Sequence, residues 1–203
     1  DKVGREALFT GLLRADPSIS WVSFGFENGD FYGANRREQA QYRLVESKWD
    51  VERKTAIRQI DYYAGYEGSL YQTHSKTVEN DYHAAGRSWF KAASTSEGAI
   101  WTDVYRFAST GHPGLNTAIQ VEQAGEPLGV VSIAIELNRL DHWLQARMAG
   151  REGMAFLLGP DRKLLASSET KFSDAAVEGQ PSPSLADRSI FEALAPYLAS
   201  KQA

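Results

Sequence analysis

One arginine in the middle of the chain stands among several aromatic residues. Arg87 opens the segment Arg87–Ala93, which also holds Trp89 and Phe90, and a second aromatic segment follows at 101–105. A guanidinium group stays protonated in proteins and presents a planar fork of donors that matches a carboxylate. This combination predicts a pocket for a small molecule that carries a carboxylate. The alternative, which composition alone favours, is that Arg87 pairs with an acidic neighbour and the aromatic residues form core.

Motifs for catalysis or metal binding are missing from the sequence. There is no Gly-x-Ser-x-Gly elbow, no phosphate-binding glycine loop and no zinc motif. The chain has no cysteine, and its four histidines, His74, His83, His112 and His142, do not have metal-ligand spacing. We therefore expect no enzyme activity, no metal and no cofactor.

The totals describe a folded and mildly acidic chain. Of its 203 residues, 42% are hydrophobic, which is enough for one good core, and the net charge is -4. A negative net charge gives no broad attraction to phosphate backbones, so nucleic acid is not expected as a partner. No apolar run reaches the ~18 residues of a membrane span, and no signal peptide is evident. Both ends nevertheless look cut, and we interpret the chain as a piece of a longer polypeptide.

The first part of the chain predicts a helix followed by an antiparallel hairpin. Apolar residues recur with three-and-four spacing over 5–15, which favours an amphipathic helix that ends before Pro17. Residues 19–26 alternate between apolar and small polar side chains, and the Glu-Asn-Gly-Asp sequence at 27–30 is typical of a hairpin turn. Further strands are expected at 30–34, 41–46 and 55–63, with a short helix over 50–58 as an alternative.

The stretch 64–86 has no clear period and is predicted to be a long surface loop. Residues 88–94 favour a short helix directly after it. Five tyrosines lie in or beside the loop and form either a lid over the pocket mouth or ordinary loop packing: Tyr62, Tyr63, Tyr66, Tyr71 and Tyr82.

The most apolar run of the chain follows two strand-like segments at 100–108 and 114–123. Leu128–Leu137 is rich in valine and isoleucine and apolar on both faces, which predicts a strand in the centre of the sheet. An amphipathic helix over 138–148 is expected to lead the chain to a second module.

That second module should begin, like the first, with a hairpin. Residues 154–167 are predicted to form two strands around a Gly-Pro-Asp turn. Residues 172–186 have the glycine, proline and serine content of a loop, and 189–200 have the apolar spacing of a helix. The strands that would complete a second sheet are absent from the sequence.

Four segments, taken in their order and spacing, resemble the double-Cache (dCache) family. Members of this family are extracytoplasmic sensor domains of bacterial receptors such as histidine kinases of two-component systems, nucleotide cyclases and chemoreceptors. With the residues around them, the segments span residues 5–170. They are Trp21–Phe31, Arg87–Ala93, Trp101–Gly111 and Gly129–Leu137, with Leu140 after the last.

The resemblance implies an α+β fold in which two PAS-like antiparallel sheets are stacked beside a long N-terminal helix. Residues 1–17 would be the end of that helix, 18–137 a membrane-distal ligand-binding module, and 138–149 a connecting helix. Residues 150–203 would be the first part of a membrane-proximal module. The resemblance also implies flanking transmembrane helices, a periplasmic or extracellular location on an inner-membrane protein, and a homodimer.

The resemblance further suggests which residues contact the ligand. In members that bind amino acids, an Arg-x-Trp-Tyr segment grips the ligand carboxylate. Arg87 and Trp89 match this segment, and Phe90 stands where tyrosine is frequent. Tyr105 matches a position that faces the ligand.

Two positions depart from the pattern of the amino-acid binders. Phe107 and Ala134 stand where those members carry carboxylates for the ligand ammonium group. A buried ammonium without such a partner is strongly unfavourable, so we expect a small organic acid that lacks an amine. Asp103 either contacts this ligand or hydrogen-bonds backbone at a strand bend. The predicted ligand-binding residues are Arg87, Trp89, Phe90, Trp101, Asp103, Tyr105, Phe107 and Ala134.

We therefore expect a sensor domain that binds a small carboxylic acid in its distal module. A shift of loop and sheet would then pass along the N-terminal helix to a cytoplasmic output, by the difference in ligand affinity between two states. The alternative is a ligand-free structural or dimerisation module, whose pocket is filled by its own side chains and which responds to a partner protein.

Overall fold

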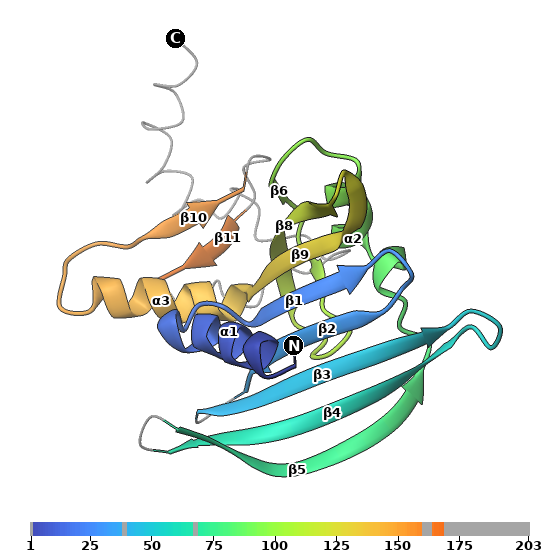
Figure 1. The fold of residues 1–203 in the computed structure, drawn as a ribbon. Coiled ribbons are helices and arrows are strands. Elements are labelled where there is room, and N and C mark those ends of the chain that lie inside the picture. Colours follow the sequence, from blue (N-terminus) through green and yellow to red (C-terminus); the bar gives the residue numbers. More distant parts are fainter. Residues whose placement is uncertain (1, 38–39, 67–68, 160–163, 169–203) are drawn as a thin grey trace. The chain divides into compact units, whose positions relative to one another are not determined.

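The chain folds into two compact units. The computed structural model describes residues 2–37, 40–66, 69–159 and 164–168 (Figure 1). The first unit takes its described residues from 1–103 and 115–135, and the second from 104–114 and 136–203. Within the described residues, no helix is long and apolar enough to cross a membrane.

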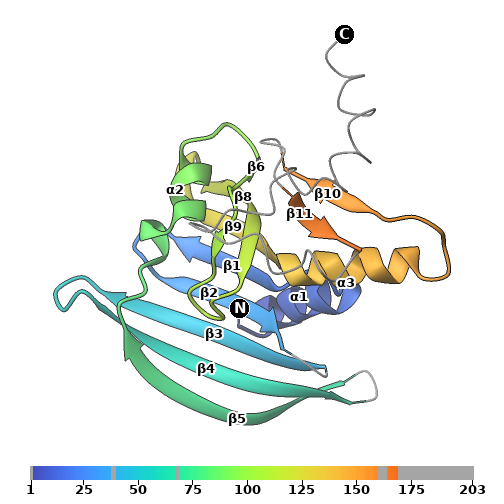
Figure 2. The same ribbon diagram turned by 180° about the vertical axis from the view of Figure 1, so that it is seen from behind.

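A largely antiparallel sheet dominates the structure, as predicted, and a meander of five consecutive strands forms much of it. The strand order is β5-β4-β3-β2-β1-β9-β8-β6, and β7 pairs with the first residues of β8. Figure 2 shows the same sheet from behind. The meander strands are β1 (Trp21–Phe26), β2 (Phe31–Arg36), β3 (Gln41–Asp50), β4 (Thr55–Tyr66) and β5 (Ser69–Asn80), and the others are β6 (Ile100–Trp101), β7 (Tyr105–Arg106), β8 (Pro113–Gln123) and β9 (Glu126–Glu136).

Two sequence signals proved reliable for this sheet. The predicted hairpin joins β1 to β2, where Gly29 has a φ of +91° and the Asn28 Oδ1 atom accepts a hydrogen bond of 3.0 Å from the Asp30 N–H. Glycine suits this turn because it has no Cβ to clash at positive φ. The apolar run of β9 lies between β1 and β8, so it has a neighbour on each side, as expected for a central strand.

The prediction of a long loop over 64–86 was wrong. Residues 69–80 form β5, which pairs with β4 over its whole length, and a single 3-10 turn, η1 (Ala84–Gly86), follows. Most side chains of β5 are exposed, so the sequence has no apolar period to reveal the strand. Its backbone ladder to β4 holds it instead. The alternative helix over 50–58 is also wrong, because residues 51–54 form a turn and β4 begins at Thr55.

The predicted short helix is present as α2 (Ser88–Ser94), and it packs against β1. Trp89 and Phe90 are both buried. A Cβ atom placed on Gly25 of β1 would lie 2.8 Å from Cη2 of Trp89 and 3.0 Å from Cδ2 of Phe90. Gly25 is therefore the position at which the sheet leaves room for the helix.

The first prediction concerns this contact. Gly25→Ala should lower the free energy of unfolding by about 1–3 kcal/mol, because the added methyl group overpacks the contact with the Trp89 ring. Urea unfolding measures the change. Gly98→Ala is the control, since a Cβ at Gly98 meets nothing within 4 Å. Equal stabilities of the two variants would contradict the packing of α2 on β1.

Helix α1 (Lys2–Ala15) covers the opposite side of β1 and β2. Its 14 residues include the predicted amphipathic stretch. Phe9 and Leu13 of this helix enter an apolar cluster of the first unit. The other buried members of that cluster come from the strands and are Val22, Tyr32, Ala34, Tyr42 and Leu44.

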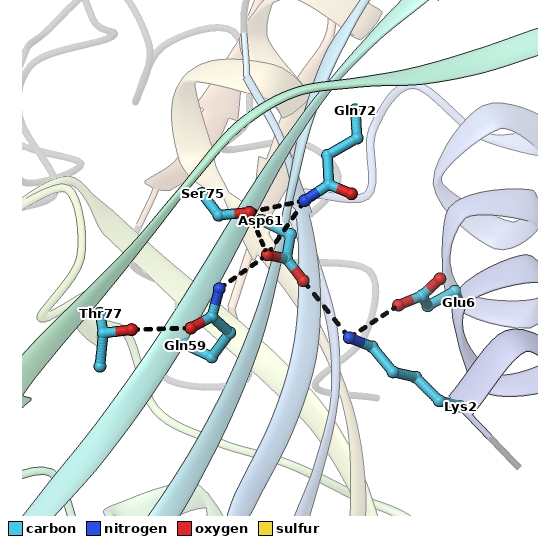
Figure 3. A network of polar contacts seen from close by, with 7 residues as sticks. All are labelled: Lys2, Glu6, Gln59, Asp61, Gln72, Ser75 and Thr77. Carbon is cyan, nitrogen blue, oxygen red and sulfur yellow. Dashed lines mark hydrogen bonds and ion pairs between the residues drawn. The ribbon is translucent and has the colours of Figure 1, made fainter.

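A buried carboxylate connects α1 to the outer strands (Figure 3). Asp61 of β4 accepts hydrogen bonds from Gln59 Nε2 at 2.9 Å and from Ser75 Oγ at 2.7 Å. Lys2 of α1 forms an ion pair of 3.5 Å with its other oxygen. Burial alone would raise the pKa of Asp61, but these hydrogen bonds and the Lys2 ammonium outweigh burial and lower it.

The second prediction is a pH dependence of this connection. Because the pKa of Asp61 lies below its ordinary value of 3.8, the charged form stabilises the fold above pH 3.8, and this stabilisation is lost as the pH falls through the lower folded-state pKa. Asp61→Asn should cost about 1–3 kcal/mol at neutral pH. The difference from wild type should shrink in chemical unfolding below pH 3.8.

Glu79→Gln is the matched control for Asp61→Asn, since Glu79 is an exposed acid on the neighbouring strand β5. It should change stability little at any pH. A stability difference for Asp61→Asn that stays constant from neutral to acidic pH would contradict the role given to the charge.

The second unit contains helix α3 (Leu137–Met148) and a small hairpin of β10 (Phe156–Leu158) and β11 (Leu164–Ser167). All three elements were predicted. The buried Asp141 of α3 accepts a hydrogen bond of 2.7 Å from the Ser167 N–H, which fixes β11 to the helix. The loop predicted at 172–186 and the helix predicted at 189–200 lie outside the described residues.

Candidate functional site

The strand register divides the side chains of the meander between two faces. Residues paired across neighbouring antiparallel strands point to the same face, and the faces alternate along each strand. Gly25 pairs with Phe31, Phe31 with Ser47, and Ser47 with Arg58. We call the face that carries these four residues the front face. Since α2 contacts Gly25, this helix also packs on the front face.

Charges are segregated between the two faces of β1 to β5. Register and alternation place every carboxylate of these described strands on the back face, with α1, and none on the front face. The front face instead carries only basic charged residues. The back-face acids are Glu46, Asp50, Asp61 and Glu79, and the front-face cations are Arg43, Arg58 and Lys76.

Two guanidinium groups approach the same aromatic ring on the front face. The Cζ atom of Arg58 lies 4.5 Å from the ring centroid of Tyr82, and that of Arg87 lies 5.4 Å from it. The Tyr82 ring in turn meets Phe31 edge-on at 5.2 Å. Within the described part of the chain, neither guanidinium has a carboxylate oxygen within the 4.0 Å of an ion pair.

Burial shifts the ionisation of these groups. Burial lowers the pKa of Arg58. Tyr82 acts against this shift, and the positive charge of the nearby Arg43 adds to it. Burial raises the pKa of Tyr82 above its ordinary value of 10.0, although both arginines and a hydrogen bond with Trp89 act against the shift. Tyr82 is therefore neutral at physiological pH and supplies no counter-charge to the two cations.

Part of the front face is polar although it is buried. Asn116 donates a 2.6 Å hydrogen bond from Nδ2 to the Ser132 hydroxyl. Asn35 accepts one of 3.0 Å from Arg43 Nε. Buried polar groups normally have such partners, so these side chains are fixed dipoles within the face.

The structure brings three of the predicted ligand-binding residues together on or beside α2. Arg87 is half-buried and precedes the helix, while Trp89 and Phe90 pack on Gly25. Ala134 is buried in β9, where it pairs with Trp21 and shares the front face with it.

The other predicted residues are Trp101, Asp103, Tyr105 and Phe107. Trp101 is 64% exposed, and Asp103 is also exposed. Tyr105 and Phe107 belong to the second unit, where their rings meet edge-on at 5.2 Å. The sequence did not reveal which side chain contacts Arg87; in the structure its guanidinium lies over the ring of Tyr82.

Sequence reasoning missed Arg58 and the role of Tyr82. The available signal was the alternation in β4, where Arg58 shares a face with the buried Ala56 and Ile60. Tyr82 was assigned to a loop, and nothing in the sequence showed that Phe31 and two arginines would surround it.

A separate hollow of about 380 Å³ lies at the end of β3 to β5. The rings of Tyr62 and His74 stack there at 4.0 Å. Tyr62 and Tyr63 thus line a hollow from within the sheet rather than as parts of a loop. The lining residues are Arg37, Gln41, Tyr42, Tyr62, Tyr63, Ala64, Thr73 and His74.

The fold is that of a PAS/PDC-like sensor domain. The chain matches the ligand-binding domain of the Campylobacter jejuni chemoreceptor Tlp3 solved with 4-methylisoleucine, with a TM-score of 0.51 at 11% identity, over 85% of this chain and 52% of that one. The same domain solved with L-norvaline gives a TM-score of 0.50 at 12% identity, over 84% of this chain and 52% of that one. At these identities the likeness concerns the fold alone.

Residues 34–142 match the family described as methyl-accepting chemotaxis protein-like, first PDC sensor domain. This match covers more than half of the chain, and the chain belongs to this family. It is 27% identical over 113 residues to the methyl-accepting chemotaxis protein PscA of Pseudomonas syringae pv. tomato. It is 28% identical over 109 residues to the methyl-accepting chemotaxis protein TlpA of Bacillus subtilis. The aligned regions cover 56% and 53% of this chain but only 18% and 16% of those relatives.

Proposed function

We propose that this chain is the ligand-sensing part of a chemotaxis receptor and that it binds a small organic acid on the front face beside α2. Membership of the chemoreceptor sensor family supports the class of receptor. In this proposal the domain lies outside the cytoplasm in a membrane-anchored homodimer. Residues 18–137 are the distal module of a double-Cache arrangement, α1 is the end of a long helix, and 150–203 begin the proximal module.

One observation carries the choice of ligand. Arg87 is half-buried beside buried aromatic residues, and its guanidinium contacts the Tyr82 ring rather than a carboxylate of the described chain. A guanidinium in such surroundings favours a bound carboxylate, since it can donate two parallel hydrogen bonds to it. Arg87 thus holds the acid group, and Trp89 and Phe90 form the adjoining wall.

The charge of the front face argues against a ligand amine. An ammonium group needs a carboxylate or several carbonyl oxygens when it leaves water. The front face of β1 to β5 has no carboxylate among its described residues, and Ala134 adds none on β9. Ammonium would also be repelled by Arg43 and Arg58, which lie on the same face. The relatives solved with 4-methylisoleucine and L-norvaline therefore differ from this chain in the ligand we propose.

The two faces of β4 give a physical route for the signal. Arg58 points to the front face, while Asp61, three residues later, points back and holds Lys2 of α1. A ligand that binds one arrangement of this strand better than another shifts the population between them. That shift reaches α1 through the same strand.

The third prediction tests the ligand class. Calorimetric titration of the chain should show binding of butanoate or butanedioate, and no binding of their α-amino counterparts, 2-aminobutanoate and aspartate, at the same concentrations. Arg87→Gln should weaken the affinity for the acid that binds by about tenfold or more, since charge-assisted hydrogen bonds contribute about 1.5–3 kcal/mol.

Arg53→Gln serves as the control because Arg53 is an exposed arginine in the turn before β4. It should bind like the wild type. Tight binding of the amino acids with none of the carboxylic acids would overturn the ligand class. Binding of no acid, with no change in melting temperature, would favour a ligand-free module.

A further inference from the structure

Arg58 and Ser47 form a polar pair in the middle of the front face. They are register partners across β4 and β3. The Arg58 Nε and Ser47 Oγ atoms are both buried, and neither has a hydrogen-bond partner among the described residues. Ser47 is only 1% exposed. Unsatisfied buried polar atoms are rare and costly, so two of them side by side point to a group that binds there.

The pair adjoins the Arg87 site through one side chain. The Tyr82 ring lies 4.5 Å from the Arg58 guanidinium and 5.4 Å from that of Arg87. Both cations therefore border the same aromatic group. Since Tyr82 stays neutral, the ring stabilises the cations by its π-face alone.

Arg43, the other front-face arginine of the meander, is already engaged. Its Nε atom donates to Asn35 Oδ1 at 3.0 Å, and its guanidinium lies 5.1 Å from the Trp21 ring. Arg58 instead lies over the rings of Tyr82 and Phe31, and its buried Nε atom has no hydrogen-bond partner among the described residues. The Nε donor of Arg58 is thus unused.

We propose that the ligand carries two anionic groups, one held by Arg87 and the other by Arg58 together with the Ser47 hydroxyl. A short dicarboxylic acid has this chemistry. The inference rests on the proposed function, because it assumes that Arg87 holds the first carboxylate. A monocarboxylic acid would leave one of the two guanidinium groups unpaired.

The fourth prediction compares two acids of equal chain length. Calorimetry should find butanedioate binding about tenfold tighter than butanoate, because the second carboxylate gains charge-assisted hydrogen bonds. Arg58→Gln should remove this advantage and leave butanoate binding unchanged. Lys76→Gln is the control, since Lys76 is an exposed front-face cation that lies over Tyr62. It should keep the wild-type ratio.

Ser47→Ala provides a second variant in case Arg58→Gln does not fold. Removing an unpartnered buried hydroxyl leaves the fold intact or slightly more stable. It should still weaken butanedioate binding by about threefold without affecting butanoate, as loss of one hydrogen bond predicts.

The outcomes separate this inference from the function on which it rests. If both acids bind equally to the wild type and Arg87→Gln abolishes binding, the second anionic group is overturned and the proposed function stands. If neither acid binds, both proposals fail. If butanedioate binds more tightly but Ser47→Ala and Arg58→Gln keep the full advantage, the second group lies elsewhere and the inference fails.

Discussion

The guanidinium groups of Arg58 and Arg87 share the ring of Tyr82, and no acid of the described chain neutralises either one. A cation over an aromatic face gains about 0.5–2 kcal/mol. Removing a cation from water costs several kcal/mol, so the ring offsets only part of that cost. The remainder has to come from residual contact with water or from an anion. The front face therefore carries positive charge that the protein itself does not balance. A carboxylate side chain on this face would pair with the arginines permanently.

The back face shows the opposite arrangement, because it carries the acids of β1 to β5. All acids of β1 to β5 project there, where Lys2 pairs with Asp61 at 3.5 Å and Lys48 lies 4.0 Å from Glu46. These two lysines partly balance the charge of the acids beside them. Strand alternation thus gives one sheet two electrostatic environments. The face with α1 carries acids that include two paired with lysines, and the face with α2 carries guanidinium groups that form no ion pair with an acid of the described chain.

Sequence patterns predicted the elements whose residues alternate or repeat according to burial. The hairpin at Gly29, the helix at 88–94 and the interior strand β9 follow from turn chemistry and apolar spacing. β5 could not be predicted this way, because most of its side chains face solvent, and it is held by its backbone ladder and by polar contacts with β4 that leave no apolar period. The same limit applied to the site. Arg87 and its aromatic neighbours lie in one segment, whereas Arg58 and Ser47 become neighbours only through the register of β3 with β4.

The two interpretations of the aromatic segment, core or ligand wall, are compatible in this fold. Trp89 is 3% exposed and fits against Gly25, as a core residue would. It also forms a hydrogen bond with Tyr82, the ring that both arginines border. Packing therefore fixes the position of Tyr82, and a fixed ring fixes the positions of the cations that stack on it. A binding site needs such rigidity, because side chains that are already ordered lose little conformational entropy when a ligand arrives.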